Sequence, residues 1–102
     1  MTITRENENG KILLKLDGWL DHESAPELGN VLEEITSAEE LVLDFGKVEY
    51  ISSAGIRMLV TAHRKARELE AQFSVIHVNP EVMSILAMTG LNKKMGILAD
   101  QG

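Results

Sequence analysis

The chain of 102 residues contains no cysteine. It therefore forms no disulfide, offers no thiol nucleophile and lacks the cysteine ligands of common zinc sites. A protein without cysteine suits a reducing compartment, and we expect a cytoplasmic location. Aromatic residues are also scarce, at 4% of the chain, whereas 44% of the residues are hydrophobic. The core is therefore expected to be aliphatic.

Long apolar runs and an excess of basic residues are missing as well. No run approaches the roughly 20 residues of a membrane-spanning helix, and the first residues lack the apolar segment of a signal peptide. The chain has 10 Lys and Arg against 16 Asp and Glu, a net charge of −6, which argues against nucleic-acid binding. We predict a single domain over residues 1–102 without direct membrane insertion.

Motifs for phosphate binding and catalysis are absent. The chain contains neither G-x-x-x-x-G-K-[ST] nor G-x-G-x-x-G, and the hydrolase motif G-x-S-x-G does not occur. A hydrolytic site could be imagined from Ser53, His22 and either Asp21 or Asp44, but no spacing specifies that geometry. The histidines and carboxylates show no ligand spacing, so we expect no metal and no cofactor.

Strand-like and helix-like segments alternate along the chain. Strands are expected at residues 2–6, 12–16, 41–45 and 73–78, with a bend and further alternation up to residue 51. Helices are expected at 24–37, 56–69 and 79–90. The first two strands read as an antiparallel hairpin around Asn-Gly, and strands separated by helices pair in parallel. The sequence predicts an α/β fold, a mixed sheet of four to five strands with helices packed on it.

Several residues mark the expected element boundaries. Ser24 and Glu27 match the S-x-x-E capping box, which predicts Ser24 as a helix N-cap. Asn79 is expected to be the N-cap of the last helix and Gly90 its C-cap, whereas Gly18 is expected to end the second strand. The apolar face of the middle helix is expected to comprise Ile56, Leu59, Val60, His63, Ala66 and Leu69, which leaves Met58 outside it.

Two serines stand before the middle helix, in the stretch YISSAGIRMLV at residues 50–60. A serine at a helix start accepts a hydrogen bond from a free amide, so a capping role for Ser52 or Ser53 is the simpler interpretation. The same place suits a phosphate, because free amides and the positive helix end stabilise negative charge. A phosphate there would repel a partner with an acidic or apolar surface.

Three segments resemble the STAS domains of bacterial anti-sigma factor antagonists. They are LVLDFGKVEYISSAGIRMLV at 41–60, LDGWLDHESAPEL at 16–28 and NPEVMSILAMTGL at 79–91. The resemblance implies a STAS-like fold and a signalling protein that is not an enzyme. Such a protein binds an anti-sigma factor, itself a serine kinase of the GHKL type, and thereby frees a sigma factor. Phosphorylation by this kinase separates the partners, and a PP2C-type phosphatase reverses it.

The resemblance also implies site residues. The family's acceptor lies two residues before a glycine, which corresponds to Ser53 before Gly55. Ser52 is the alternative acceptor, because it stands where the family often has aspartate. The resemblance implies that Asp21 and Asp44 lie near the acceptor. The implied partner-binding residues are Asp21, Asp44, Ser52, Gly55, Arg57 and Met58.

The chain departs from the family pattern at several positions. Trp19 stands where glutamate is common, and it is either a partner anchor or part of the core. Ala54 replaces a frequent serine, and a terminal helix usual in the family is expected to be missing or very short. STAS domains also serve as scaffolds of stress-signalling complexes and as accessory subunits of membrane transporters, which is the alternative function. The sequence does not specify the oligomeric state.

Overall fold

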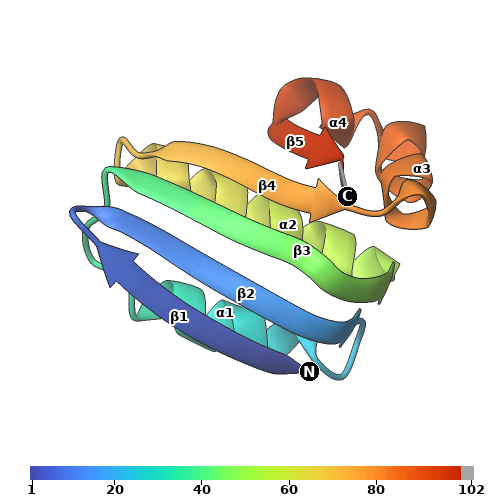
Figure 1. The fold of residues 1–102 in the computed structure, drawn as a ribbon, viewed down its shortest axis with the longest axis horizontal. Helices are drawn as coiled ribbons and strands as arrows, with labels where there is room; N and C mark the ends of the chain where they lie inside the picture. The colour runs from blue at the N-terminus through green and yellow to red at the C-terminus, as the bar shows by residue number, and fades with distance from the viewer. Residues whose placement is uncertain (100–102) are drawn as a thin grey trace.

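The computed structural model describes residues 1–99, which form one five-stranded sheet and four helices (Figure 1). The strands follow one another in space as they do in sequence, and β1 is antiparallel to β2 while the other neighbours are parallel. The elements are β1 (Thr2–Glu8), β2 (Lys11–Leu20), α1 (Ala25–Glu33), β3 (Glu40–Ile51), α2 (Ser53–Glu68), β4 (Gln72–Val78), α3 (Pro80–Thr89), α4 (Leu91–Lys94) and β5 (Gly96–Ala99).

The opening hairpin confirms the prediction from Asn-Gly. Asn9 has a φ of 48° and Gly10 a φ of 85°, the two positive values that a tight primed turn requires. The turn sets Glu8 opposite Lys11 and fixes the register of the antiparallel pair.

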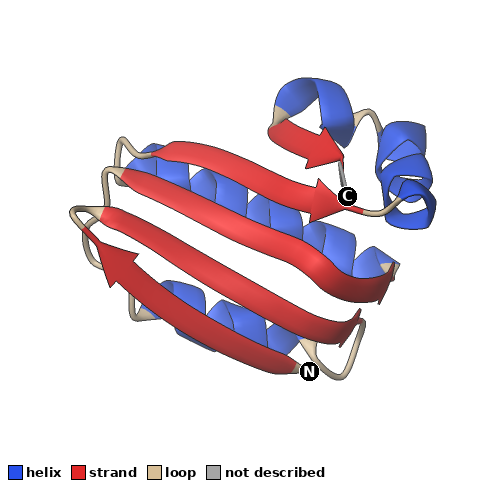
Figure 2. Ribbon diagram, viewed as in Figure 1, coloured by secondary structure: helices blue, strands red, loops and turns tan. Residues whose placement is uncertain are grey.

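Helices α1 and α2 cover one face of the sheet, and the opposite face of β1 to β3 is open (Figure 2). The core lies between these helices and the sheet, where alternate strand residues meet the buried faces of the helices. It is aliphatic as predicted, and Phe45 is the single aromatic residue among its buried members in residues 1–99. The largest fully buried side chains include Leu14, Leu16, Leu28, Leu41, Leu43 and Leu59.

Two boundary predictions near the end of β2 are wrong. Gly18 does not end the strand: it has a φ of 121° beside a register shift, and β2 continues to Leu20. Ser24 precedes α1, but its hydroxyl caps no helix amide. Instead this buried hydroxyl donates to the carbonyl of Trp19 at 2.6 Å and accepts from the amide of Asp21 at 2.9 Å. Hydrogen bonds to the end of β2 and to the loop after it have replaced the capping box.

Other boundaries also differ from the sequence pattern. Helix α1 ends at Glu33 rather than near residue 37, and β3 runs unbroken through the expected bend. Helix α2 starts at Ser53, and its buried face centres on Leu59, Ala62 and Ala66, while the expected face members Ile56 and Val60 are half-buried.

The last helix confirms its predicted caps, and the segment after it adds structure. The Asn79 side chain accepts from the Val82 amide at 2.8 Å, and Gly90 ends α3 with a φ of 78°. The short helix α4 and the strand β5 follow, so the sheet has the upper of the two expected strand numbers within residues 1–99.

The first turn of α2 rests directly on the end of β2. The Ser52 amide donates to the Leu20 carbonyl at 3.0 Å. A Cβ atom added to Gly55 would lie 2.4 Å from that carbonyl oxygen and 2.8 Å from a side-chain carbon of Ile51. Only glycine therefore permits this approach of helix to strand.

We expect Gly55→Ala to destabilise the protein by about 1–3 kcal/mol, because the new methyl group overlaps backbone that cannot move aside. Gly29→Ala is the matched control in α1. Its Cβ would meet only the flexible end of Met58, at 3.2 Å, so the gain in helix propensity should leave stability unchanged or raised by up to ~1 kcal/mol. Urea unfolding measures both, and equal effects would contradict the close approach at Gly55.

Candidate functional site

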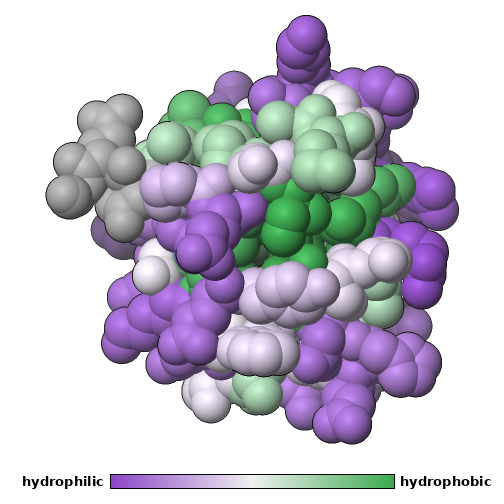
Figure 3. All heavy atoms as spheres, turned by 90° about the vertical axis from the view of Figure 1, so that its right-hand side faces the viewer, coloured by the Kyte–Doolittle hydropathy of each residue, from purple (hydrophilic) through white to green (hydrophobic). Residues whose placement is uncertain are grey.

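The candidate site lies at the end of the molecule where β2, β3 and β4 finish and where α1, α2 and α3 begin, on the right in Figure 1. Figure 3 views this end directly and shows hydrophobic atoms gathered in its middle, with hydrophilic atoms bordering them. The serine pair stands here, because Ile51 is the last residue of β3 and α2 follows at once. The fold thus places the serine pair at the end of the molecule that carries this apolar surface.

The two serines have different environments. Ser52 is the N-cap of α2: it has extended backbone, and its hydroxyl accepts from the Gly55 amide at 3.3 Å. Ser53 is the first residue of the helix, its side chain is exposed, and its hydroxyl forms no hydrogen bond with any group in residues 1–99. The capping role of Ser52 is therefore confirmed. The Ser53 hydroxyl is accessible from solvent.

Asp21 lies beside the serine pair, because it follows Leu20, whose carbonyl binds the Ser52 amide. One carboxylate oxygen accepts from the amides of Glu23 and Ser24, each at 3.1 Å. The amide of Ser24, followed by its hydroxyl and the amide of Glu23, lowers the pKa of Asp21 below its ordinary value of 3.8. Asp21 thus supplies a fixed negative charge at neutral pH and orders the loop before α1.

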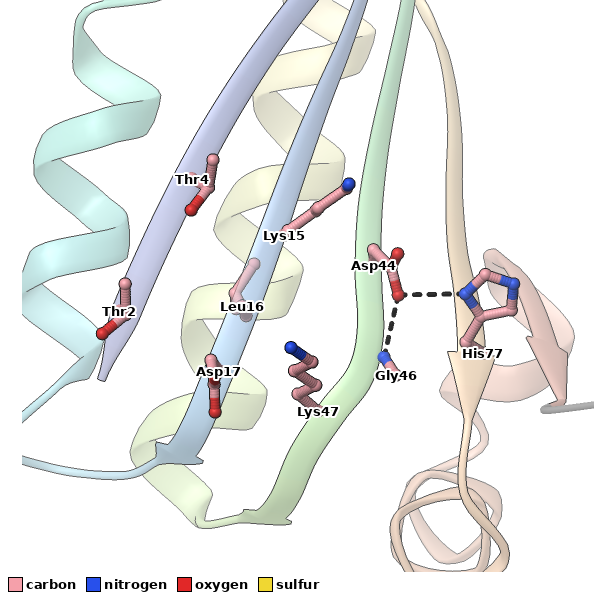
Figure 4. Close-up of a pocket in the computed structure, with 9 residues that line it drawn as sticks. All are labelled: Thr2, Thr4, Lys15, Leu16, Asp17, Asp44, Gly46, Lys47 and His77. Atoms are coloured by element: carbon pink, nitrogen blue, oxygen red, sulfur yellow. Dashed lines mark hydrogen bonds and ion pairs between the residues drawn. The ribbon is translucent and has the colours of Figure 1, made fainter. Parts of the chain in front are cut away.

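Asp44 is placed elsewhere, on the open face of the sheet (Figure 4). Its Oδ1 atom accepts from the Gly46 amide at 2.8 Å and lies 3.0 Å from Nδ1 of His77. Seven residues of continuous strand, roughly 23 Å at the usual rise, separate Asp44 from Ile51 at the end of β3. The expectation that Asp44 lies near Ser53 is wrong, because β3 continues from Asp44 to Ile51 before α2 begins.

The Asp44–His77 pair borders a hollow of about 390 Å³ on the open face. His77 has a φ of 60°, a strained value for a residue with a side chain, and it falls where the pairing of β4 with β5 shifts register. In Figure 4 the imidazole points toward Asp44. The residues lining the hollow are Thr2, Thr4, Lys15, Leu16, Asp17, Asp44, Gly46, Lys47 and His77.

Of the remaining predicted residues, Arg57 is exposed, whereas Met58 and Gly55 are packed into the fold. Arg57 is exposed one helical turn after Ser53, so it is available to a partner. Met58 is half-buried and packs between α1 and α2 against Gly29, so the expectation that it lies outside the buried face is wrong. Gly55 is buried and acts through the close approach that it permits, not through a side chain.

Two aromatic side chains form an exposed pair at the same end of the sheet as the serines, and the sequence pattern singles out only Trp19. Trp19 is 55% exposed and Tyr50 is 43% exposed, and their ring centroids are 5.4 Å apart. The Trp19 indole also donates to a carboxylate oxygen of Glu49 at 3.1 Å. Trp19 is therefore not part of the core. Strand alternation predicts that Tyr50 is exposed, because successive strand residues face opposite sides of the sheet and the next residue, Ile51, is buried. Trp19 stands in the same relation to the buried Leu20.

The imagined hydrolytic site does not form within residues 1–99. Asp44 bonds His77 rather than His22, and the Ser53 hydroxyl contacts no histidine. The same part of the chain contains no group of three or more His, Asp or Glu side chains placed to hold a metal ion. None of the helices described is long and apolar enough to span a membrane.

The chain is similar to proteins of a known family. A family model described as "Mlab, STAS domain" matches residues 3–99. The chain is 26% identical to the anti-sigma F factor antagonist of Paenibacillus polymyxa over 100 residues, which is 95% of this chain and 86% of that one.

Two solved structures share the fold. An anti-sigma factor antagonist from Mycobacterium paratuberculosis superposes with a TM-score of 0.80 at 26% identity, covering 95% of this chain and 84% of that one. A sulfate transporter family protein from Wolinella succinogenes gives a TM-score of 0.82 at 16% identity, with 92% and 80% covered. The second likeness concerns the fold alone.

The two serines should differ in their effect on stability. We expect Ser52→Ala to cost about 1 kcal/mol of unfolding free energy, because the Gly55 amide loses its partner. Ser53→Ala should change stability by less than about 0.5 kcal/mol, because the exposed hydroxyl contacts nothing. Thermal and urea unfolding measure both variants. A larger loss for Ser53→Ala than for Ser52→Ala would reverse the assignment of the cap.

Asp21 should titrate below its ordinary range. Because its pKa is lowered in the folded state, its contribution to stability is present above pH 3.8 and is lost as the pH falls through the lowered value. Carboxyl-detected NMR should show Asp21 still mostly ionised at pH 3.8, its ordinary midpoint. A midpoint at or above the ordinary value would contradict the hydrogen-bonded loop.

Proposed function

Because the chain belongs to the STAS domain family, we propose that it is an anti-sigma factor antagonist that phosphorylation of Ser53 switches off. One observation carries the proposal: Ser53 is an exposed serine whose hydroxyl has no hydrogen-bond partner within residues 1–99, at the first position of a helix whose capping role is already filled by Ser52. Phosphorylation can therefore occur without removing the cap of α2. In this proposal the protein acts as a binding module rather than as an enzyme.

The start of α2 suits a phosphoserine. The amides of the first helical turn have no intrahelical acceptor, and Ser52 satisfies only the amide of Gly55. The amides of Ser53 and Ala54 and the positive helix end are then available to a phosphate, which carries about −1.5 to −2 charges. A phosphate added here changes the surface charge while the fold persists.

A partner would be expelled from this end by that charge. The apolar surface in Figure 3 lies at the same end of the molecule as Ser53. Ile56 and Val60 on α2 and Met83 on α3 are half-buried and pack against the core. The chain already has a net charge of −6, and Asp21 lies beside the serine pair. A phosphate on Ser53 would weaken binding in two ways: its charge repels acidic groups of the partner, and the phosphate must lose water when an apolar partner surface covers it.

The proposed partners follow from the family resemblance. The first is an anti-sigma factor that is also a GHKL-type serine kinase, and its capture in the cytoplasm releases a sigma factor. The second is a PP2C-type phosphatase that removes the phosphate. Asp21 and Arg57 flank the acceptor and are proposed as contacts of the kinase, whereas Met58 and Asp44 are proposed to act only through the fold.

A scaffold or accessory subunit of a stress-signalling complex or membrane transporter is the second candidate. The likeness to the sulfate transporter family protein, at 16% identity, supports it at the level of the fold. The antagonist proposal has more support, since 26% identity extends over 95% of the chain.

The proposal is tested by incubating the protein with each purified candidate anti-sigma kinase of the same genome and Mg-ATP, followed by intact-mass analysis and peptide mapping. We expect one phosphate, on Ser53. Ser53→Ala should bind the kinase as the parent does but accept no phosphate, and Ser53→Asp should bind about tenfold or more weakly, a loss of about 1.4 kcal/mol. Ser52→Ala, which keeps the acceptor, should still be labelled.

Two results would overturn the proposal. If the label maps to Ser52, or if Ser53→Ala is labelled as strongly as the parent, the acceptor is misassigned. If no kinase binds or labels the protein while a transporter ATPase from the same genome forms a complex with it, the accessory-subunit function replaces the antagonist function.

A further inference from the structure

Exposed aromatic side chains are concentrated at one spot of this molecule. The chain has one Trp, one Tyr and two Phe. Phe45 is buried and Phe73 is half-buried against the core, whereas Trp19 and Tyr50 are both largely exposed. The latter two residues are paired in the register between β2 and β3, immediately before the ends of those strands. The aromatic surface that remains exposed therefore lies at the same end of the sheet as the serine pair.

The aromatic pair is held in place by its own contacts. The rings of Trp19 and Tyr50 lie 5.4 Å apart at an interplanar angle of 52°, a favourable tilted arrangement. The indole N–H donates to Glu49, and the carbonyl of Trp19 accepts the hydroxyl of buried Ser24. Both the backbone and the ring of Trp19 are therefore fixed before any partner arrives, which lowers the entropy lost on binding.

The charges around this pair are negative. Glu49 contacts the indole directly. On the other side, Trp19 borders a hollow of about 290 Å³, to which Asp21, Glu23 and Glu27 contribute carboxylates; its other lining residues are Met1 and Ser24. The amino terminus at Met1 is the one cationic group among these lining residues. The surroundings thus favour a cationic partner surface and oppose a second copy of this acidic chain.

We infer that Trp19, Tyr50 and Glu49 form an aromatic anchor for a partner protein that presents a basic surface. Lysine or arginine side chains of the partner would lie over the faces of the two rings, where cation–π attraction is favourable. They would also form ion pairs with the surrounding carboxylates. Large, rigid aromatic side chains of this kind dominate binding energy at protein interfaces. The inference rests on the proposed function, because it identifies the anchored partner as the anti-sigma kinase that modifies Ser53.

The inference is tested with the protein labelled with 5-fluorotryptophan. Trp19 is the only tryptophan of the chain, so the labelled protein gives a single ¹⁹F resonance whatever the kinase contains. On addition of the unlabelled candidate kinase that labels Ser53, we expect this resonance to shift and to lose its sensitivity to exchange of H₂O for D₂O, because the indole becomes buried in the complex.

Matched variants measure how much the anchor contributes. Trp19→Ala should weaken kinase binding at least tenfold, and Trp19→Phe should retain most of the affinity. Leu98→Ala is the control, because Leu98 is also 55% exposed but lies on β5, at the far edge of the sheet; its affinity should stay within twofold of the parent. Glu49→Gln should weaken binding less than Trp19→Ala and reduce its dependence on salt. Thermal unfolding checks that each variant is folded.

The possible failures are distinguishable. If the kinase binds and labels Ser53 but the ¹⁹F resonance does not respond, or if Trp19→Ala binds as tightly as Leu98→Ala, the aromatic anchor is refuted and the proposed function stands. If no candidate kinase binds, the proposed function and the anchor both fail. A ¹⁹F shift that depends on the concentration of the protein alone would identify a second copy as the occupant and overturn the inference.

Discussion

The close approach between the first turn of α2 and the end of β2 is the constraint on which the site depends. Gly55 allows the helix to rest on the Leu20 carbonyl, and the Ser52 amide binds the same oxygen. This contact fixes Ser53 at the start of α2 and holds Asp21, the residue after Leu20, next to it. Residues from two separate elements therefore form one surface without a direct bond between their side chains.

Local patterns predicted the fold because they are set by neighbouring residues: the Asn-Gly hairpin, the caps of the last helix and the alternation of strands with helices are all confirmed. The failures arose where a residue's contacts or strand pairing departed from what its local pattern indicates. A glycine suits both a bulge and the end of a strand, so the sequence does not distinguish the two roles for Gly18. The Ser24 hydroxyl bonds the Trp19 carbonyl instead of an amide of α1. Asp44 lies on a strand that is longer than its sequence pattern indicates. Ser53 as acceptor stays a prediction.

The open face of the sheet carries its own polar structure, remote from the serine pair. A register shift in β4 leaves His77 in a left-handed conformation, and the imidazole crosses to Asp44 on β3. The strained backbone costs of order 1–2 kcal/mol, which the hydrogen bonds of Asp44 to His77 and to the Gly46 amide offset in part. Asp44 thus links the middle of β3 to the neighbouring strand, which is a structural role.

The order of the strands has a consequence for how the chain can fold. Because the spatial order β1-β2-β3-β4-β5 repeats the order of synthesis, every strand docks on one that has already left the ribosome. Each strand is joined to its neighbour by one turn or one helical crossover, and no strand needs to be inserted between two that are already paired. The contact that places Asp21 next to the serine pair involves only the end of β2 and the start of α2. It can therefore form while β4, α3 and β5 are still being translated.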